Sequence, residues 1–314
     1  MKLKVIAVCW ALCVCSFSSV SKEEPMVQVS IGTLDTLAPF ENNLFPDKTV
    51  QIWLPEGYSD SKKYAVLYMH DGQNLFDANS TWNKQAWDID DVATRLMATG
   101  KVRDFIVVGA FNGNVNGKFT RRNEYFPQKV FEALPGKWQQ HLKQSQSYNT
   151  PLFEGPISSD KYLQFLTQVL KPYIDTHYSV HTDRDNTFVM GSSMGGLISL
   201  YAISEYPDIF GGAACLSTHW PGGNPEADSP VPAAFVKYMQ EHLPDPQNHK
   251  IYFDLGTAQL DSYYPPSQAL ADAVMREKGY NYQNWITNTF VGDGHEEHYW
   301  RDRLHIPLLF LLGK

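Results

Sequence analysis

Cysteine is scarce in this chain and unevenly placed. The 314 residues include four cysteines, of which Cys9, Cys13 and Cys15 lie near the start and only Cys215 lies in the remainder. A disulfide framework is therefore excluded for the body of the chain, which must be stabilised by a hydrophobic core. The 43% of residues that are hydrophobic are enough to build a large one.

Positive charge is also in deficit. The chain has 26 Lys and Arg against 34 Asp and Glu, a formal net charge of −8, and its basic residues are scattered. This balance argues against nucleic acid or an anionic membrane surface as a partner. We expect a small or uncharged ligand instead.

The apolar stretch near the N-terminus is too short to span a bilayer. Val5–Val14 follows Lys2 and Lys4 and precedes the small residues Ser19-Val20-Ser21. Since about 20 apolar residues are needed to cross a membrane, this pattern predicts a cleaved export signal over residues 1–21. We therefore expect a periplasmic or extracellular protein without stable membrane insertion, whose residues 22–314 form a single domain.

Short apolar runs alternate with helical periods through most of the chain. Two segments of alternating polarity, 26–31 and 48–54, predict half-exposed antiparallel strands at a sheet edge. Continuous apolar runs that are followed by helical periods predict buried parallel strands with crossover helices. The expected strands are 64–69, 105–109, 187–190, 210–216, 250–253 and 285–291, and the expected helices are 88–97, 161–174, 197–202, 231–243, 266–278 and 300–312. The sequence thus predicts an α/β fold with a mostly parallel, eight-stranded sheet and helices on both faces.

Two segments are too long and irregular to be ordinary connections. Residues 112–160 are rich in Asn, Gly, Gln and Pro, and residues 217–229 contain Pro221-Gly222-Gly223-Asn224-Pro225. Long loops inside a compact domain tend to be functional. Both would leave the carboxyl ends of strands, where open α/β sheets bind ligands, so we expect them to lie over an active site.

A serine lies at the turn between a predicted strand and a predicted helix, in Gly191-Ser192-Ser193-Met194-Gly195. This G-x-S-x-G pattern, in that context, is typical of a nucleophile elbow. Such a turn forces its serine to positive φ and needs small residues two positions before and after it, which Gly191 and Gly195 supply. Ser193 is therefore the candidate nucleophile.

A serine hydroxyl needs a base to remove its proton, and that base needs an acceptor to hold its tautomer. After a nucleophile elbow these partners follow in the order acid, then histidine. His295 follows the last predicted strand in a glycine-containing loop and is the preferred base, with His298 as the alternative. His219 and His305 are more easily explained as a loop residue and a helix-surface residue.

The acid should lie in the loop after the penultimate strand, where two carboxylates occur. Asp261 lies far enough into the loop to reach a histidine and is preferred. Asp254 is still at the strand end and could instead cap backbone N–H groups. Asp293 is a third choice, because a residue two positions before the base usually points elsewhere.

Acyl transfer also needs donors for the oxygen that becomes negative. The elbow supplies the backbone N–H of Met194. The second donor should lie in the loop after the strand that ends at Met69, where we assign the N–H of Gln73, with Gly72 as the alternative.

Three separated motifs resemble one known group of proteins. His70-Asp71-Gly72-Gln73-Asn74-Leu75-Phe76, the elbow Met190–Gly196, and Gly294-His295 followed by Trp300 are similar to the esterase D-like esterases of the α/β-hydrolase superfamily. That group includes S-formylglutathione hydrolases, enterochelin esterases, feruloyl and acetylxylan esterases and mycolyltransferases. The resemblance runs from about residue 45 to the C-terminus. It implies an α/β-hydrolase fold, Ser193 as nucleophile, His295 as base, and an oxyanion hole near Gln73 and Met194.

We therefore expect a serine carboxylic-ester hydrolase that works through an acyl-enzyme and needs no cofactor or metal. Acyl esters of sugars and siderophore-type esters are the expected substrates. Arg121 and Arg122 could bind a carboxylate or catecholate, or could be neutralised by neighbouring acids. The aromatic faces of Trp82, Trp87, Trp138 and Trp220 could line the cleft or pack in the core, and Trp220 is taken as a candidate substrate contact.

Other functions fit less well. His295-Glu296-Glu297-His298 places its histidines three positions apart, whereas the zinc-peptidase helix motif needs four. The glycines near Gly113–Lys118 also lack the spacing of a phosphate-binding loop. An acyltransferase of the same fold, or a non-catalytic ligand-binding protein on a hydrolase scaffold, stays open as an alternative.

Overall fold

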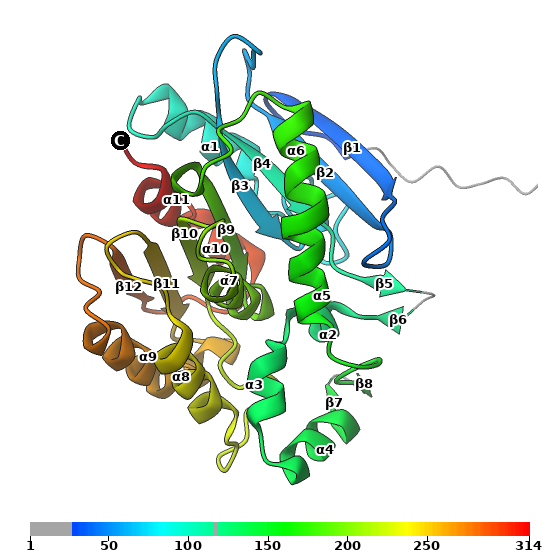
Figure 1. Cartoon of the computed structure of the whole chain (residues 1–314), viewed down its shortest axis with the longest axis vertical. Coiled ribbons are helices and arrows are strands. Elements are labelled where there is room, and N and C mark those ends of the chain that lie inside the picture. The colour runs from blue at the N-terminus through cyan, green and yellow to red at the C-terminus, as the bar shows by residue number, and fades with distance from the viewer. Residues whose placement is uncertain (1–26, 116–117, 148) are drawn as a thin grey trace, which may run out of the picture.

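The computed structural model describes residues 27–115, 118–147 and 149–314 (Figure 1). The predicted export signal and Met26 of the first predicted strand lie outside these residues. In the described part of the chain, no helix combines the length and the hydropathy that a membrane crossing requires.

Eight strands form one mixed sheet in the order β1-β2-β4-β3-β9-β10-β11-β12, which confirms the predicted number of strands. The pairs β1/β2 and β2/β4 are antiparallel, and the other neighbouring pairs are parallel. The strands are β1 (Thr33–Phe40), β2 (Lys48–Leu54), β3 (Ala65–His70), β4 (Phe105–Ala110), β9 (Thr187–Ser192), β10 (Gly212–Leu216), β11 (Lys250–Gly256) and β12 (Trp285–Phe290).

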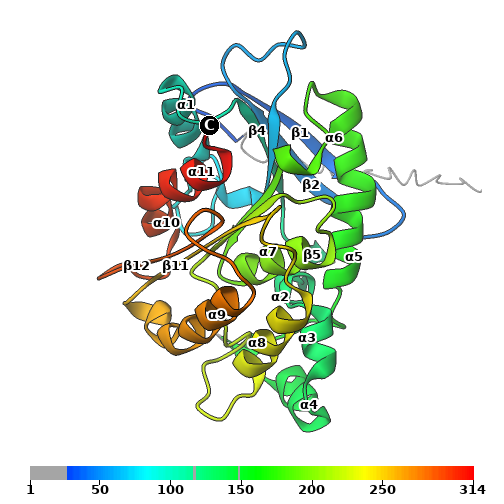
Figure 2. The same cartoon turned by 60° about the vertical axis from the view of Figure 1, so that its left-hand side comes forward.

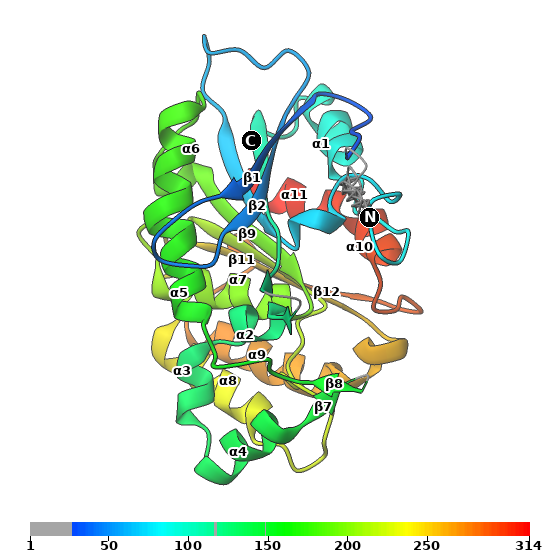
Figure 3. The same cartoon turned by 90° about the vertical axis from the view of Figure 1, so that its right-hand side faces the viewer.

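Alternate residues of the buried strands supply two cores, one on each face of the sheet. In β3, Val66 and Tyr68 belong to one cluster, whereas Leu67 and Met69 belong to the other. Figures 2 and 3 show the helices that cover the two faces. The first cluster packs under α5 (Ser159–Gln164), η2 (Phe165–Leu170), α6 (Lys171–His177), α7 (Met194–Glu205), α8 (Val231–His242) and α9 (Pro265–Glu277). The second packs under α1 (Ile89–Ala98), α10 (Glu297–Arg303) and α11 (His305–Leu312).

The predicted sheet edge needs correction. The first strand is Thr33–Phe40, and residues 27–31 are not part of a strand. Residues 48–54 do form a strand, but β2 lies between β1 and β4 and is almost wholly buried. The polar residue Lys48 contributed to the prediction of a half-exposed strand. It is buried instead, because a salt bridge to Glu124 compensates its charge.

The segment 112–160 is more regular than its composition predicts. Pro127 and Pro135 directly precede short helices, in keeping with the preference of proline for helix starts. The segment contains β5 (Asn114–Val115), β6 (Lys118–Phe119), α2 (Arg121–Tyr125), α3 (Gln128–Ala133), α4 (Gly136–Gln144), β7 (Gln146–Ser147) and β8 (Thr150–Pro151).

Proline also divides the last predicted helix. The chain forms α10 and α11 with a break at Leu304, rather than one helix over 300–312. Pro307 has no N–H to donate to the carbonyl of Arg303, so the α-helical hydrogen bonds cannot run through this point.

The strand order brings the candidate residues to one edge of the sheet. Asp71 follows β3, Ser193 follows β9, and Ser217 follows β10. Asp261 lies in the short helix η4 (Gln259–Tyr263) after β11, and His295 follows β12. Because these strands are parallel, all five residues lie beyond the same carboxyl ends, where a binding site is expected.

Candidate active site

Ser193 lies at a strained turn. Its φ is 60° and its ψ is −121°, a region that side-chain-bearing residues rarely adopt and that costs about 1–3 kcal/mol. The turn is so tight that a Cβ at Gly191 would lie 2.8 Å from the carbonyl of Gly195. The N–H of Ser193 donates to the carbonyl of Leu216 at 2.9 Å, which ties the turn to the neighbouring strand β10. The expected elbow geometry is therefore present.

The two residues whose backbone N–H groups are the predicted oxyanion donors, Gln73 and Met194, line the same cavity as Ser193. Met194 begins α7, where helical geometry leaves its N–H without an acceptor inside the helix. Gln73 lies in the short helix η1 (Gly72–Asn74) after β3. Gln73, Met194 and Ser193 line the same cavity of about 810 Å³. Gly72, the alternative donor, packs against β4 instead, since a Cβ there would lie 2.6 Å from the carbonyl of Gly109.

The structure brings His295 and Asp261 together. Nδ1 of His295 lies 2.5 Å from Oδ1 of Asp261, and the His295 N–H donates to Oε1 of Gln259 at 2.7 Å. The ring of Trp300 packs edge-on against the His295 ring at 5.1 Å. With Nδ1 engaged by the carboxylate, Nε2 is the nitrogen left to act on a group in the cavity that His295 and Ser193 both line.

The second carboxylate oxygen of Asp261, Oδ2, is held by two further donors. Oδ2 accepts from the Ser217 hydroxyl at 2.5 Å and from the Gly256 N–H at 2.6 Å. The Ser217 oxygen itself accepts from Nε1 of Trp300 and from Nη2 of Arg303, both at 2.9 Å. Those two donors force the Ser217 proton toward Asp261, because a hydroxyl has only one proton to give.

The two alternative acids are engaged elsewhere. Asp254 accepts from Nη2 of Arg303 at 3.0 Å, and Asp293 accepts from Nη1 of the same guanidinium at 3.0 Å. Burial raises the pKa of Asp254, although the charge of Arg303 opposes the shift. Neither carboxylate contacts His295 in the described residues, so these two acids form a structural pair of ion bridges around Arg303.

His298, the alternative base, is engaged by Gln85 and Glu296 rather than by one of the three candidate aspartates. Its Nδ1 lies 2.9 Å from Oε1 of Gln85 and 3.4 Å from a carboxylate oxygen of Glu296. His219 lines the cavity, but its ring is bonded on both sides, to the Tyr264 hydroxyl at 2.7 Å and to the Gly223 carbonyl at 2.8 Å.

Trp220 is not a substrate contact, which corrects the prediction made for it. The side chain is fully buried and packs against Phe235 and Phe253, while its Nε1 donates to Gln268. The residue before it, His219, reaches the cavity, but Trp220 points into the core because the two neighbours lie on opposite sides of the loop. Of the other tryptophans considered, Trp82 and Trp87 line the cavity, with Trp82 85% exposed at its rim.

Arg121 and Arg122 both line the cavity but differ in their bonding. Arg121 makes a two-pronged salt bridge to Asp71, with Nε to Oδ1 and Nη2 to Oδ2 each at 2.7 Å. Arg122 donates through Nη1 to the Pro151 carbonyl at 3.5 Å. Arg121 is therefore neutralised in place by an acid that is 50 residues away in the sequence.

Several polar residues of the cavity had no signal in the sequence. Glu297 accepts from Nδ2 of Asn74 at 3.3 Å and from Nδ2 of Asn83 at 2.7 Å. Glu296 accepts from the side-chain amides of Gln85 and Gln259, and these bonds lower its pKa. The contacts of Asn74, Asn83 and Gln85 each join segments more than 200 residues apart, and no local pattern could have predicted them.

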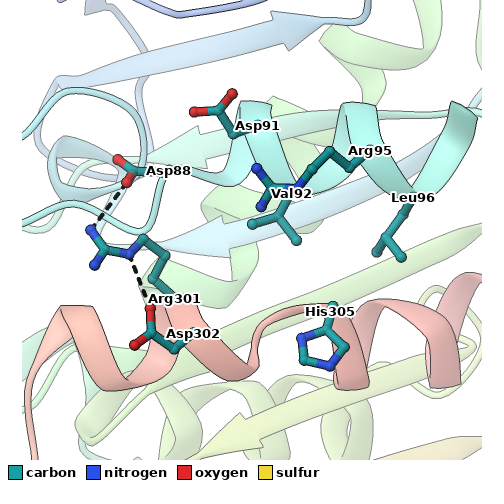
Figure 4. A pocket seen from close by; sticks show the side chains of 8 residues that line it. All are labelled: Asp88, Asp91, Val92, Arg95, Leu96, Arg301, Asp302 and His305. Atoms are coloured by element: carbon teal, nitrogen blue, oxygen red, sulfur yellow. Dashed lines mark hydrogen bonds and ion pairs between the residues drawn. The ribbon is translucent and has the colours of Figure 1, made fainter.

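A separate cavity of about 470 Å³ lies between α1 and the α10–α11 pair (Figure 4). Three of its charged groups are paired with one another, since Arg301 bridges Asp88 at 3.2 Å and Asp302 at 3.4 Å. Over residues 27–115, 118–147 and 149–314, no group of three His, Cys, Asp or Glu side chains is arranged to hold a metal ion.

Comparison with known proteins finds esterases. A family model described as "Putative esterase" matches residues 42–311. A ferulic acid esterase superposes with a TM-score of 0.63 at 22% identity, covering 89% of this chain and 97% of its own. The enterobactin esterase of Shigella flexneri gives 0.62 at 16% identity, covering 91% and 60%. The endo-1,4-beta-xylanase/feruloyl esterase of Xylanibacter ruminicola is 24% identical over 215 residues, which are 66% of this chain and 22% of that protein.

Replacing the two buried aspartates, Asp261 and Asp254, should affect different properties of the protein. Asp261→Asn can donate to Nδ1 of His295 and so hold the wrong tautomer, which in comparable sites lowers kcat about 10⁴-fold. Asp254→Asn should instead cost about 3 kcal/mol of folding stability, because it leaves part of the buried Arg303 charge uncompensated. Ester hydrolysis and urea unfolding of both variants measure the contrast. A larger loss of turnover in folded Asp254→Asn would contradict it.

The folded protein should lose stability in mild acid. Burial, with a contribution from the nearby His295, lowers the pKa of His219 to about 3, so the folded state resists a proton that the unfolded state accepts below about 6.5. This stability is complete above pH 6.5 and is lost as the pH falls, by about 2 kcal/mol at pH 5. The melting temperature of His219→Gln should therefore depend less on pH between 7 and 5 than that of the wild type. Exposed His305→Gln serves as the control, and equal slopes in all three proteins would refute the assignment.

Proposed function

The chain belongs to the esterase family whose model it matches and is an ester hydrolase, and from this premise we propose that Ser193, His295 and Asp261 carry the reaction. The match spans residues 42–311, most of the chain, and confirms the resemblance drawn from three sequence motifs. The observation that best supports the assignment is the 2.5 Å contact of His295 with Asp261 beside the cavity that Ser193 lines.

In the proposed reaction His295 first acts as a base. Its Nε2 takes the proton of the Ser193 hydroxyl while Oγ attacks the ester carbonyl, and the buried Asp261 stabilises the imidazolium that forms. The N–H groups of Gln73 and Met194 then donate to the carbonyl oxygen as it becomes negative. His295 returns the proton to the departing alcohol, and an acyl-enzyme is left on Ser193. In the second half of the cycle, water deprotonated by His295 attacks the acyl carbon, the bond to Oγ of Ser193 breaks, and His295 returns the proton to Oγ as the acid leaves.

The lining of the cavity favours an uncharged ester that carries rings and hydroxyl groups. At the rim, Trp82 is 85% exposed and Phe119 is 51% exposed, and such faces stack on sugar rings or aryl acyl groups. The charged side chains of the cavity do not favour an anionic substrate. Arg121 is neutralised by Asp71, and Glu296 and Glu297 add negative charge. We therefore place acyl esters of carbohydrates, including hydroxycinnamoyl esters, ahead of anionic siderophore-type esters.

The siderophore-type ester and the acyltransferase alternatives call for their own measurements. Arg122, on the cavity wall, is the cation that a catecholate would meet. An acyltransferase would pass the acyl group to an added sugar hydroxyl in preference to water. Product analysis with and without an acceptor alcohol separates transfer from hydrolysis.

Ser193→Ala should reduce ester hydrolysis by several orders of magnitude while the protein stays folded, because it removes the proposed nucleophile. A fluorophosphonate should label the wild type at Ser193 and leave the variant unlabelled. Assays with methyl ferulate, feruloylated and acetylated xylan fragments and a cyclic trilactone siderophore would rank the substrate classes. Full activity in folded Ser193→Ala would disprove the assignment, and a clear preference for the trilactone would disprove the choice of carbohydrate esters.

Export to the periplasm or the outside of the cell is also part of the proposal. It rests on the charged start, the apolar stretch and the small residues within 1–21. Expression of the full chain in a bacterium, followed by fractionation and N-terminal sequencing, should find the protein outside the cytoplasm and beginning near Lys22. An intact Met1 on active, cytoplasmic protein would argue against a cleaved signal.

A further inference from the structure

Arg121 occupies a position between the two chain segments that carry the proposed oxyanion donors. It begins α2 and reaches inward to Asp71, which directly follows β3. The same guanidinium donates through Nη2 to the carbonyl of Ser192, the last residue of β9, at 3.4 Å. Asp71 stands two residues before Gln73, and Ser192 stands two residues before Met194. One side chain therefore contacts both segments at matching positions.

Asp71 needs to be held, because its backbone is strained. Its φ of 57° lies in the left-handed region, which is uncommon for residues other than glycine although aspartate enters it more readily than most. The carboxylate receives Nε and Nη2 of Arg121 and Nδ2 of Asn112, each at 2.7 Å, and the Asp71 N–H donates to the Tyr125 hydroxyl at 3.1 Å. These bonds fix the turn that sets the direction of the N–H of Gln73, two residues later.

The two segments also pack directly against one another. A Cβ added at Gly195 of the elbow would meet Oδ2 of Asp71 at 3.5 Å, an ordinary van der Waals distance, so little space separates this carboxylate from the elbow. The Arg121 guanidinium lies 5.2 Å from the centre of the Tyr125 ring, which supports it from the α2 side. A displacement of Arg121 would therefore alter the spacing of both segments.

We infer that Arg121 is a positioning residue of the oxyanion hole: by binding Asp71 and the carbonyl of Ser192 it sets the distance between the N–H groups of Gln73 and Met194. This inference rests on the proposed function and goes beyond it, since it removes Arg121 from the substrate-binding role predicted from the sequence. Lysine can replace it only in part, because an ammonium lacks the planar fork that meets both carboxylate oxygens and a third acceptor.

The pair stays ionised wherever the proposed catalysis operates. Burial alone would raise the pKa of Asp71, but the charge and hydrogen bonds of Arg121 hold it below its usual value. Burial likewise opposes the charge of Arg121, yet Asp71 raises the pKa of this guanidinium above its usual value. The positioning effect should therefore not itself depend on pH across the range in which ester hydrolysis is assayed.

The test compares Arg121→Gln and Arg121→Lys with the wild type on a neutral aryl ester such as p-nitrophenyl acetate. A displacement of about 1 Å at a reacting group can cost about 100-fold in rate, so we expect kcat of Arg121→Gln to fall about 100-fold. KM should change less than about threefold, because the neutral substrate has no group for Arg121 to bind. Arg121→Lys should fold, keep one bond to Asp71 and show a smaller loss of kcat.

Two further readouts distinguish positioning from a general structural effect. The affinity of a boronic acid that mimics the tetrahedral intermediate should fall in proportion to kcat/KM, whereas the pH profile of kcat should keep its shape. Arg184→Gln is the matched control, because it removes another two-pronged arginine contact, to Asp185 on the protein surface. Its kcat should remain at the wild-type value.

The outcomes separate the inference from the proposed function. An active wild type with folded Arg121→Lys and Arg121→Gln variants that keep its kcat would overturn the inference alone. A rise in KM at constant kcat would also overturn it, since that result belongs to a substrate contact. A folded wild type that neither hydrolyses esters nor reacts with the fluorophosphonate would overturn the proposed function, and the inference with it.

Discussion

The buried carboxylate of Asp261 is the constraint on which the rest of the site depends. A charge without solvent is tolerated only when its oxygens are fully hydrogen-bonded. Asp261 meets this requirement with donors from three strand ends: His295 after β12, Ser217 after β10 and Gly256 at the end of β11. The imidazole is consequently oriented only when these parallel strands are in register.

Buried ion pairs surround this arrangement and reinforce it. Arg303 joins Asp254 and Asp293 while it donates to Ser217, so the end of α10 is tied to two strand ends. On the other side of the elbow, the pair of Arg121 and Asp71 holds the loop after β3. Arg303 and Asp254 are 49 residues apart in the sequence, and Arg121 and Asp71 are 50 apart, so these two pairs tie distant segments together and stiffen the site on both sides of Ser193. Stiffness of this kind is what an oxyanion hole requires, because donors that are already aligned need no reorganisation during the reaction.

The sequence predicted the local parts of the site better than its long-range contacts. The elbow at Ser193 was recognisable because a strand, a tight turn with glycines at fixed positions and a helix are all local features. The choice of Asp261 over Asp254 depended on loop length alone, and the contact with His295 at 2.5 Å agrees with it. Trp220 was misjudged, since nothing local distinguishes a tryptophan that faces a cavity from one that faces the core. For Arg121 the sequence left open whether it binds substrate or is neutralised by an acid, because its partner Asp71 is 50 residues away.

What the sequence determined by itself is the alternation of apolar runs and helical periods, the glycines at the elbow and the order of serine, acid and histidine, because each of these follows from neighbours along the chain. The position of β2 inside the sheet and the pairing of each buried charge were decided only by the tertiary structure. The reason is physical. A buried charge is satisfied by whichever group folding brings to hydrogen-bonding distance, and that distance is set by the packing of strands and helices rather than by separation in the sequence.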